Sequence, residues 1–213
     1  MAQSFDKSDD RLREYGFSIV LALCVPLLLF LLAAGLILPQ TWWYSHEFRF
    51  TGVDVEEGSA ITNTLLAYFF AQTDQLPEVP FLQLEKEHLR DVKRVVQNAV
   101  AGFAFLVLLT SALSLILGKS SRRKAWLLGS CLTIFCLLLL AVVPFDPAFV
   151  AFHQVFFPQG NWSFPSSSYM LQVYRLQFWQ DAAFYWAIHV LLLTFAIFLF
   201  SMRYKKTLLA SKT

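Results

Sequence analysis

Four long apolar stretches constrain most strongly what this chain can fold into. They lie at about residues 17–38, 99–117, 125–143 and 182–202, and each is long enough to cross the hydrocarbon layer of a bilayer as a helix. Hydrophobic residues make up 57% of the sequence, a share that a soluble domain rarely reaches. The sequence therefore predicts a mainly α fold, a four-transmembrane-helix bundle, in which residues 1–213 form a single integral membrane domain.

Basic residues cluster in the short segments that flank these spans. Residues 119–124, between the second and third spans, carry four Lys and Arg residues, and residues 203–206, after the fourth span, carry three. Because short basic loops stay in the cytoplasm, both segments are expected on that side. An even number of spans then places both chain termini in the cytoplasm. The two long connections, residues 39–98 and 144–181, are expected on the extracytoplasmic side.

The first outer connection, residues 39–98, is too long to lack structure of its own, and we expect it to form a small cap. The loose alternation of apolar residues over Glu47–Val55 is typical of a short strand, whereas the apolar spacing over Ser59–Ala71 is helical. From Gln83 onward, an amphipathic pattern predicts a helix that runs directly into the second span.

The second outer connection, residues 144–181, contains four prolines, which limit it to short elements. Residues 148–157 are apolar but reach only about half-way across a membrane, which favours an interfacial or re-entrant helix. Beyond this helix, Gly160 predicts a tight turn. The serines at 166–168 predict a turn or a helix cap.

The strong local signatures of common enzymes are absent from this sequence. It has no Gly-x-Ser-x-Gly nucleophile elbow, no Walker-type phosphate loop, no His-Glu-x-x-His and no dinucleotide fingerprint. No soluble cofactor is expected, and a net charge of +2 gives no reason to expect a nucleic acid as partner. What remains as possible reactive chemistry is four histidines, of which three lie in the outer connections.

His88 is the first candidate for acid/base chemistry. Asp91 follows it at the i+3 spacing, so on a helix the carboxylate can reach one imidazole nitrogen and fix the tautomer of the ring. A general base is oriented in this way. The same spacing also fits an exposed helix that carries ordinary surface ion pairs, and the spacing alone leaves both interpretations open.

His153 lies among phenylalanines close to the end of the third span. Protonating an imidazole at this depth is costly, which lowers its pKa and favours the neutral form that can accept a proton. The alternative is a ring that only straddles the interface. The other two histidines have simpler explanations: His46, beside Trp43 and Glu47, is expected at the interface, and His189 is expected to form a hydrogen bond between spans.

Two motifs together resemble those of a known family. His88-Leu-Arg-Asp91-Val-Lys93 and Phe152-His153-Gln-Val-Phe156-Phe157, the latter followed by Gly-Asn-Trp-Ser-Phe at 160–164 and Phe-Trp at 178–179, are similar to elements of the bacterial lipoprotein intramolecular transacylases. The four-span layout and the place of the cap match as well, over essentially the whole chain. One departure is Tyr174-Arg175-Leu-Gln177, where the family tends to have a proline, so Arg175 is expected to alter the local turn or to meet a polar substrate group.

The resemblance implies acyl transfer within a diacylated bacterial lipoprotein in the inner membrane. The sn-2 acyl chain of its S-diacylglyceryl-cysteine moves to the α-amine of the same cysteine and gives the lyso-form lipoprotein. His88 and His153 are implied to be catalytic. Weaker supporting positions are Asp91, Lys93, Tyr68, Asn161 and Trp162. The site is implied to face the extracytoplasmic side, and no oligomeric state is indicated.

This chemistry needs no nucleophile from the protein, because the attacking amine and the target ester both belong to the substrate. An α-amine with a pKa of about 8 has a usable neutral fraction. One histidine can remove a proton from the amine while the other donates to the departing oxygen. The sequence does not fix the two roles, although the neighbouring Asp91 favours His88 as the base.

Two other functions remain open at this point. The first is a metal-dependent membrane hydrolase that uses His46, His88 and His153 with a carboxylate such as Asp146. The spacings match no common ligand pattern well. The second is a non-enzymatic sensor or assembly factor whose cap binds a lipoprotein or a partner protein.

Overall fold

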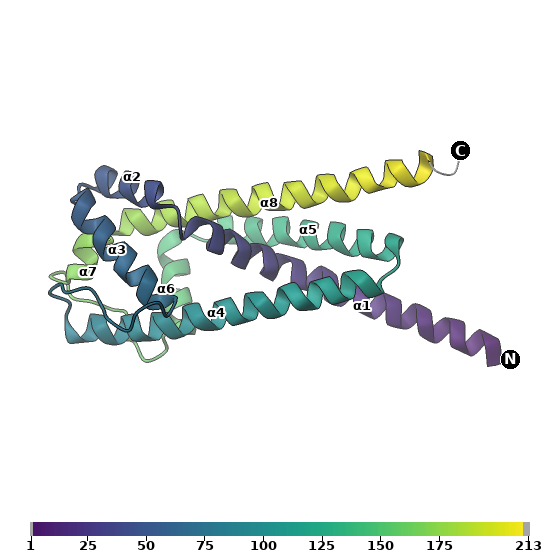
Figure 1. The fold of residues 1–213 in the computed structure, drawn as a ribbon, viewed down its shortest axis with the longest axis horizontal. Coiled ribbons are helices and arrows are strands. Elements are labelled where there is room, and N and C mark those ends of the chain that lie inside the picture. The colour runs from purple at the N-terminus through teal and green to yellow at the C-terminus, as the bar shows by residue number, and fades with distance from the viewer. Residues whose placement is uncertain (1, 211–213) are drawn as a thin grey trace. The chain divides into compact units, whose positions relative to one another are not determined.

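The computed structural model describes the backbone of residues 2–210 and the side chains of residues 10–202. Over this part of the chain the regular structure is entirely helical (Figure 1). The helices are α1 (Ala2–Ile37), α2 (Thr41–Thr51), α3 (Val55–Phe69), α4 (Gln83–Ile116), α5 (Lys119–Ala141), α6 (Phe145–Phe156), α7 (Tyr169–Val173) and α8 (Leu176–Ala210). The mainly α fold is therefore confirmed, and the strand predicted over Glu47–Val55 is wrong.

The chain divides into two compact units, which we name the span unit and the cap unit. The span unit takes its described residues from 1–33, 102–141 and 187–213. The cap unit consists of residues 34–101 and 142–186. Both outer connections predicted from the sequence thus contribute to one compact body.

Four helical segments are long and apolar enough to cross a membrane. They are Asp10–Ile37, Gln83–Ile116, Lys119–Ala141 and Leu176–Met202. At about 1.5 Å per residue, the second is longer than the hydrocarbon layer is thick. Its first half, residues 83–98, carries the charged residues of the helix and belongs to the cap unit, so we expect this half to lie outside the hydrocarbon layer.

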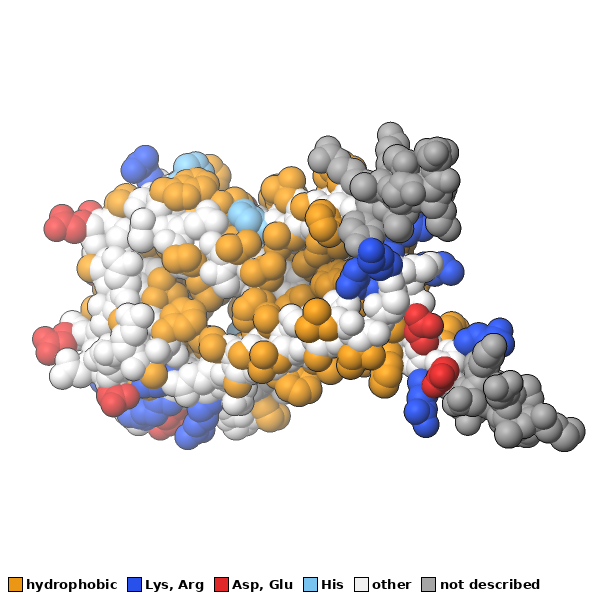
Figure 2. All heavy atoms as spheres, turned by 45° about the vertical axis from the view of Figure 1, so that its right-hand side comes forward, with side chains coloured by type: hydrophobic (Ala, Val, Ile, Leu, Met, Phe, Trp, Pro, Cys, Tyr) orange, Lys and Arg blue, Asp and Glu red, His pale blue; other side chains and the backbone are white. Residues whose placement is uncertain are grey.

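The outward faces of the span-unit helices are apolar, as lipid contact requires. Leu108, Leu115, Phe195 and Phe200 expose 60% or more of their surface, and Figure 2 shows hydrophobic side chains gathered over these helices. A soluble protein would not leave so many large apolar residues uncovered. The membrane assignment of the four segments is consistent with this surface.

Within the span unit, α1 and α5 pack closely at a glycine. A Cβ atom added to Gly129 would lie 2.5 Å from Val25 Cβ and 2.9 Å from the Ala22 carbonyl oxygen. The buried hydroxyl of Thr133, one turn further along α5, donates to the Gly129 carbonyl at 2.9 Å. Small residues allow membrane helices to approach in this way, and hydroxyls that bond their own backbone leave no unpaired donor in the core.

The cap unit has an aromatic core that joins α2 to the beginning of α8. Phe48 is fully buried, and its ring stacks on Phe178 with centroids 5.8 Å apart. The same ring fills the space that a side chain at Gly58 would need, which allows α2 and α3 to pack against each other. Gly52 ends α2 in the left-handed conformation, with φ of 72°, and this turn directs the chain into α3.

Candidate active site

His88 lies in the cap-unit half of α4 and is 6% exposed. Aromatic rings surround it: the Phe157 and Phe164 rings approach edge-on, at centroid distances of 4.6 Å and 5.5 Å. The ring of His153 lies 6.0 Å away, at an interplanar angle of 28°. The structure thus brings together the two histidines that the sequence singled out, among largely apolar aromatic side chains that we name the histidine pocket.

Glu85, one turn before His88, fixes the start of α4. Its carboxylate is fully buried, and Oε2 accepts a hydrogen bond from the Leu82 amide at 2.5 Å, which closes the first turn of the helix as in a capping box. Oε1 accepts from the Ser168 hydroxyl and from the Met170 amide, the latter at 2.7 Å. Three donors from two distant segments therefore hold the helix that carries His88.

His153 projects from α6, the short helix predicted to be interfacial. Its Nδ1 lies 2.7 Å from the carbonyl oxygen of Phe149, one turn earlier. Because a carbonyl only accepts, Nδ1 must carry the proton, and in the neutral ring Nε2 then keeps its lone pair. The rings of Phe149 and Trp162 flank the imidazole at 4.0 Å and 5.0 Å between centroids.

The turn after α6 brings Asn161 to α4. Gly160 has a φ of 80°, the left-handed conformation that its position was expected to require. The amide of Asn161 donates from Nδ2 to Asp91 Oδ2 at 2.7 Å, and Gln159 Nε2 donates to the same oxygen at 2.6 Å. The other carboxylate oxygen of Asp91 accepts from Arg94 at 2.8 Å.

Asp91 does not hydrogen-bond to His88 in the described part of the chain, contrary to the i+3 expectation. Its two oxygens are occupied by Arg94, Gln159 and Asn161. Nδ1 of His88 is buried with no hydrogen-bond partner. Asn161 lies close enough to the ring to favour its protonated form, without completing a hydrogen bond to Nδ1.

Burial controls the protonation of both imidazoles. It lowers the pKa of His88 to about 4, and a positive charge on His153 adds to this lowering. The side chain of Asn161 and the charge of Asp91 act in the opposite direction and raise the pKa. Burial also lowers the pKa of His153, opposed by the hydrogen bond to the Phe149 carbonyl. Both rings are therefore neutral at pH 7, the state in which an imidazole can accept a proton from one nitrogen or donate from the other.

Two of the supporting positions lie in a different cluster. The Lys93 ammonium is 2.8 Å from Asp74 Oδ1 and 4.2 Å from the centre of the Tyr68 ring. Neither Lys93 nor Tyr68 makes a ring contact, hydrogen bond or ion pair with either histidine among the described residues. This cluster holds the loop between α3 and α4 against α4. Its interactions support a structural role rather than contact with the reacting atoms.

Arg175 and Ser168 have structural roles. Arg175 donates to the carbonyl of Thr51 at the end of α2, so it joins the start of α8 to α2 instead of facing the histidines. Ser168 caps α7, as its place after Pro165 indicated, by accepting a hydrogen bond from the Leu171 amide at 3.3 Å.

Gln159 and Glu85 lie near the histidines and were not singled out from the sequence. Phe157 and Phe164 stood in the second motif, but without an assigned role. Next to the pocket, a polar cavity of about 470 Å³ is lined by Asp91, Gln159 and Asn161 among others. This cavity forms where the turn at Gly160 brings the residues after α6 next to α4. No local sequence pattern predicts that this turn lies against α4.

The ligand set of the metal alternative is not assembled in the described residues. No group of three or more His, Cys, Asp or Glu side chains there could hold a metal ion. His46, the first of the four proposed ligands, instead lies beside Glu47, with Nδ1 3.2 Å from Oε1, and its side chain is 65% exposed.

The fold is similar to that of three solved structures of the membrane-integral lipoprotein intramolecular transacylase Lit from Bacillus cereus. One has a TM-score of 0.79 at 20% identity and covers 92% of this chain and 98% of that one. The other two are variants in which a histidine is replaced by arginine or by alanine. Their TM-scores are 0.80 and 0.79, both at 21% identity, covering 99% and 97% of this chain and 98% of theirs.

Sequence comparison extends the likeness. An uncharacterized protein from Aquifex aeolicus (strain VF5) is 29% identical over 110 residues, which are 51% of this chain and 50% of that protein. The match thus spans about half the length of this curated relative. The sequence model of the family described as lipoprotein intramolecular transacylase Lit matches residues 19–179, most of the chain. The resemblance of the two histidine motifs is confirmed: this chain belongs to the lipoprotein intramolecular transacylase family, a family of acyltransferases.

Proposed function

We propose that this protein is a lipoprotein intramolecular transacylase in which His88 and His153 carry out the proton transfers. Its substrate is the S-diacylglyceryl-cysteine at the N-terminus of a bacterial lipoprotein, and its product is the lyso-form with an N-acylated cysteine. The observation that carries the proposal is the 6.0 Å separation of the two imidazoles within a cluster of aromatic rings. Family membership supplies the class of reaction.

His153 is the better placed general base. The hydrogen bond from its Nδ1 to the Phe149 carbonyl leaves Nε2 as the free acceptor. The lowered pKa keeps this nitrogen unprotonated at neutral pH. This division of roles differs from the one that Asp91 suggested in the sequence, because Asp91 bonds to the Asn161 amide instead of to His88.

His88 serves as a neutral hydrogen-bond donor. With a pKa of about 4 it carries no charge at pH 7, and its Nδ1 is enclosed without a partner, so Nε2 is the ring atom left for the substrate. A neutral imidazole that donates from Nε2 can stabilise the negative oxygen that develops on the ester carbonyl. In an apolar pocket such a donor is worth more than in water, because few water dipoles compete with it.

The proposed step is balanced within the substrate and the two rings. The α-amine attacks the sn-2 ester carbonyl, the new C–N bond forms, and His153 Nε2 takes the amine proton. The carbonyl oxygen, held by His88, then reforms its double bond as the bond to the glycerol oxygen breaks. That oxygen receives the proton from His153, which leaves an amide and a free hydroxyl. The attacking amine and the ester are held in one molecule, which supplies much of the proximity advantage.

The two halves of the substrate fit the two sides of the pocket. Phe152 and Phe156 on α6 are 49% and 47% exposed and offer an apolar surface for the acyl chains. The polar cavity beside Asp91 can accept the peptide end. We place this site on the extracytoplasmic face and both termini in the cytoplasm, supported by the basic residues in the first turns of α5.

The test is to locate the acyl chains of lipoprotein N-termini. Cells that lack the protein are complemented with the wild type, His88→Ala, His153→Ala or the control His46→Ala, and N-terminal lipopeptides are fragmented in a mass spectrometer. Fragmentation is essential because intramolecular transfer leaves the total mass unchanged. We expect N-acylated lyso-form product with the wild type and His46→Ala, and a loss of about 10²- to 10⁴-fold with either of the other variants.

The same experiment tests the non-enzymatic alternative. A sensor or assembly factor would leave the acyl chains on glycerol whether or not the protein is present. Full transfer by His153→Ala would refute the proposed base. Equal loss with His46→Ala would show that the assay reports folding instead of chemistry, since this side chain is largely exposed and has no contact with the pocket.

A further inference from the structure

The span unit contains a cavity of its own. It has a volume of about 630 Å³, within the range of sites that bind small molecules. Its lining comes from all four spanning helices, and much of it is apolar, including Leu28 on α1, Val107 on α4, and Ile197 and Phe200 on α8. A cavity of this kind between membrane helices can hold a hydrocarbon chain.

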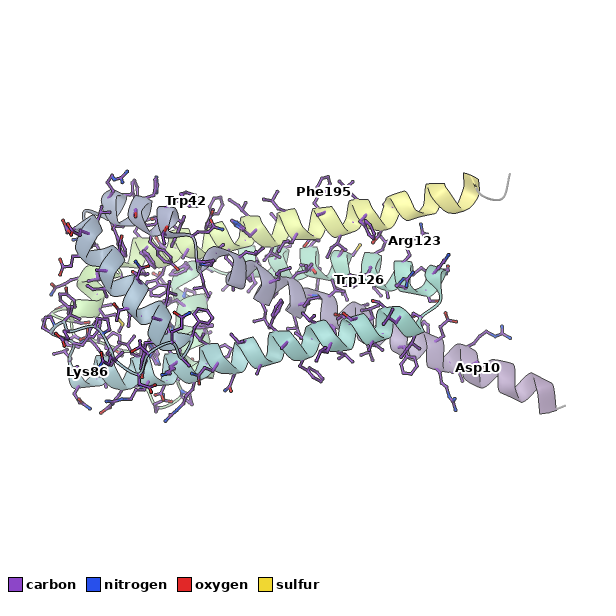
Figure 3. All side chains as sticks on the ribbon, in the orientation of Figure 1. Asp10, Trp42, Lys86, Arg123, Trp126 and Phe195 are labelled. Atoms are coloured by element: carbon purple, nitrogen blue, oxygen red, sulfur yellow. The ribbon has the colours of Figure 1, made fainter. Side chains whose placement is uncertain are left out.

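One end of this cavity is basic. Lys119, Arg122 and Arg123, all in the first turns of α5, belong to its lining. Figure 3 labels Arg123 on α5, near the connection to α4, and Trp126 on the same helix. Arg122 and Arg123 are half-buried, yet none of the three cations has a carboxylate within ion-pair distance among the described residues. Half-buried arginines without an anionic partner are a local excess of positive charge.

Two further features of this end favour an anion. The first turn of α5 has no acidic residue. The Arg122 amide donates to the Gly118 carbonyl at 2.9 Å, so the three amide groups that precede it in the helix come before the first hydrogen bond of this kind. The partial positive charge of this helix end therefore adds to the three cations. One acid lies close to this helix end: Oε1 of Glu14 is 3.0 Å from where a Cβ on Gly118 would be. One carboxylate does not balance three cations.

The wall between the basic end and the apolar part is fixed by hydrogen bonds. Arg122 donates from Nη1 to the Ser114 carbonyl at 2.8 Å, and the Trp126 indole donates to the Ser114 hydroxyl at 3.2 Å. Ser201, 7% exposed, also lines the cavity, and no hydrogen bond of its hydroxyl occurs among the described side chains. Arg122 uses one donor on the backbone and keeps the remaining donors of its guanidinium for a ligand.

We propose that this cavity binds one anionic glycerophospholipid from the leaflet on the side of the α4–α5 connection. The phosphate lies at Arg122, Arg123 and Lys119, because guanidinium groups bind phosphate oxygens in pairs. One acyl chain follows the apolar wall past Val107 and Ile197. A zwitterionic lipid is disfavoured, since its headgroup cation would meet the same positive charges. The site is independent of the histidine chemistry.

The test uses the purified full-length protein in a mild detergent. Phosphatidylglycerol and phosphatidylcholine with identical acyl chains are titrated separately, and bound lipid is measured by native mass spectrometry. We expect the protein to bind one phosphatidylglycerol about tenfold more tightly than phosphatidylcholine. The double variant Arg122→Gln/Arg123→Gln should lose this preference. The matched control Lys124→Gln, an exposed cation of the same segment outside the cavity lining, should keep it.

A second variant distinguishes a specific loss of lipid binding from misfolding of the double variant. Val107→Trp narrows the apolar part and leaves the three cations in place, so it should weaken phosphatidylglycerol binding about tenfold. Inorganic phosphate in excess should not displace the lipid. The proposal would be overturned if the wild type bound the two lipids with equal affinity, or if Lys124→Gln lost the preference as the double variant does. It would also be overturned if inorganic phosphate displaced the lipid, which would show a site for the free anion.

Discussion

Asn161 donates a hydrogen bond to Asp91 across 70 positions of the sequence, with Nδ2 2.7 Å from Oδ2. Asn161 is 8% exposed and also lies close enough to His88 to affect its protonation. This one amide therefore connects the turn after α6, which follows His153, to the helix that carries His88. It is a positioning residue in the proposed mechanism.

Asn161→Ala should reduce kcat by about 10- to 100-fold and change KM less, because the two rings lose a shared support while the apolar surface for the acyl chains is unchanged. The control is Gln159→Ala, which removes the other amide on the same Asp91 oxygen, at an exposed position. The kcat of the control should stay within about threefold of the wild type. Rates of acyl transfer on a synthetic diacylated lipopeptide test both, and equal losses would contradict the assignment.

The pH dependence of kcat/KM should show a single rising limb. The substrate amine, with a pKa of about 8, must be neutral, and so must His153. The logarithm of kcat/KM should therefore rise with a slope of about one between pH 6.5, the ordinary pKa of histidine, and 8. Below the lowered pKa of His153 the slope should approach about two, since acidification then protonates the base as well.

The opposite behaviour would assign His88 the role of a protonated acid. Since its pKa is about 4, a requirement for its charged form would make the rate fall by about tenfold for each pH unit above that value. This loss would cancel the gain from the amine and produce a flat or falling profile between pH 6.5 and 8. Initial rates in mixed micelles over pH 5 to 9 distinguish the two profiles.

Glu85→Ala should destabilise the cap unit by about 3 kcal/mol, because three donors, from Leu82, Ser168 and Met170, lose a buried charged acceptor. Glu85→Gln keeps one acceptor oxygen and should lose less. Glu87→Ala is the matched control: among the described side chains, its carboxylate accepts only from exposed Gln83, at 2.9 Å, so the change should be below about 0.5 kcal/mol. Thermal unfolding in detergent ranks the stabilities of the three variants. A loss of stability for Glu87→Ala as large as that for Glu85→Ala would refute this prediction.

Gly129→Ala should destabilise the span unit by about 1 to 3 kcal/mol, because the new methyl group would overlap Val25 and the Ala22 carbonyl. Gly102→Ala is the control within another spanning helix. A Cβ there meets nothing within 4 Å, and alanine favours the helix, so this variant should be as stable as the wild type or slightly more stable. Heat resistance of the purified variants checks the difference; equal stability of the two variants would disprove close α1–α5 packing at Gly129.

The four spans could be predicted because hydrophobic length is a local property, and the start of the α4 helix at Gln83 agrees with its amphipathic pattern. The error over α2 has a geometric cause. Phe48 and Phe50 are two apart, which fits a strand, but in the helix they fall on opposite sides: Phe48 is fully buried and Phe50 is 69% exposed. The pattern of a short segment does not reveal which of the two aromatic rings enters a core.

The candidate site was predictable only in part, for a similar reason. His88 and His153 stand out because an imidazole near the lipid boundary is unusual. The hydrogen bonds of Asp91 to Gln159 and Asn161 could not be predicted in this way, because these two residues reach Asp91 only through the turn at Gly160. Side chains that meet through a turn leave no periodic signal in the sequence.

The burial of Glu85 bears on how a two-tailed substrate reaches the histidines. One carboxylate accepts hydrogen bonds from both the first turn of α4 and the segment before α7, so these two parts cannot move apart without breaking buried hydrogen bonds. We expect the lipid-anchored cysteine to enter sideways, past Phe152 and Phe156, travelling in the plane of the bilayer instead of being lifted out of it.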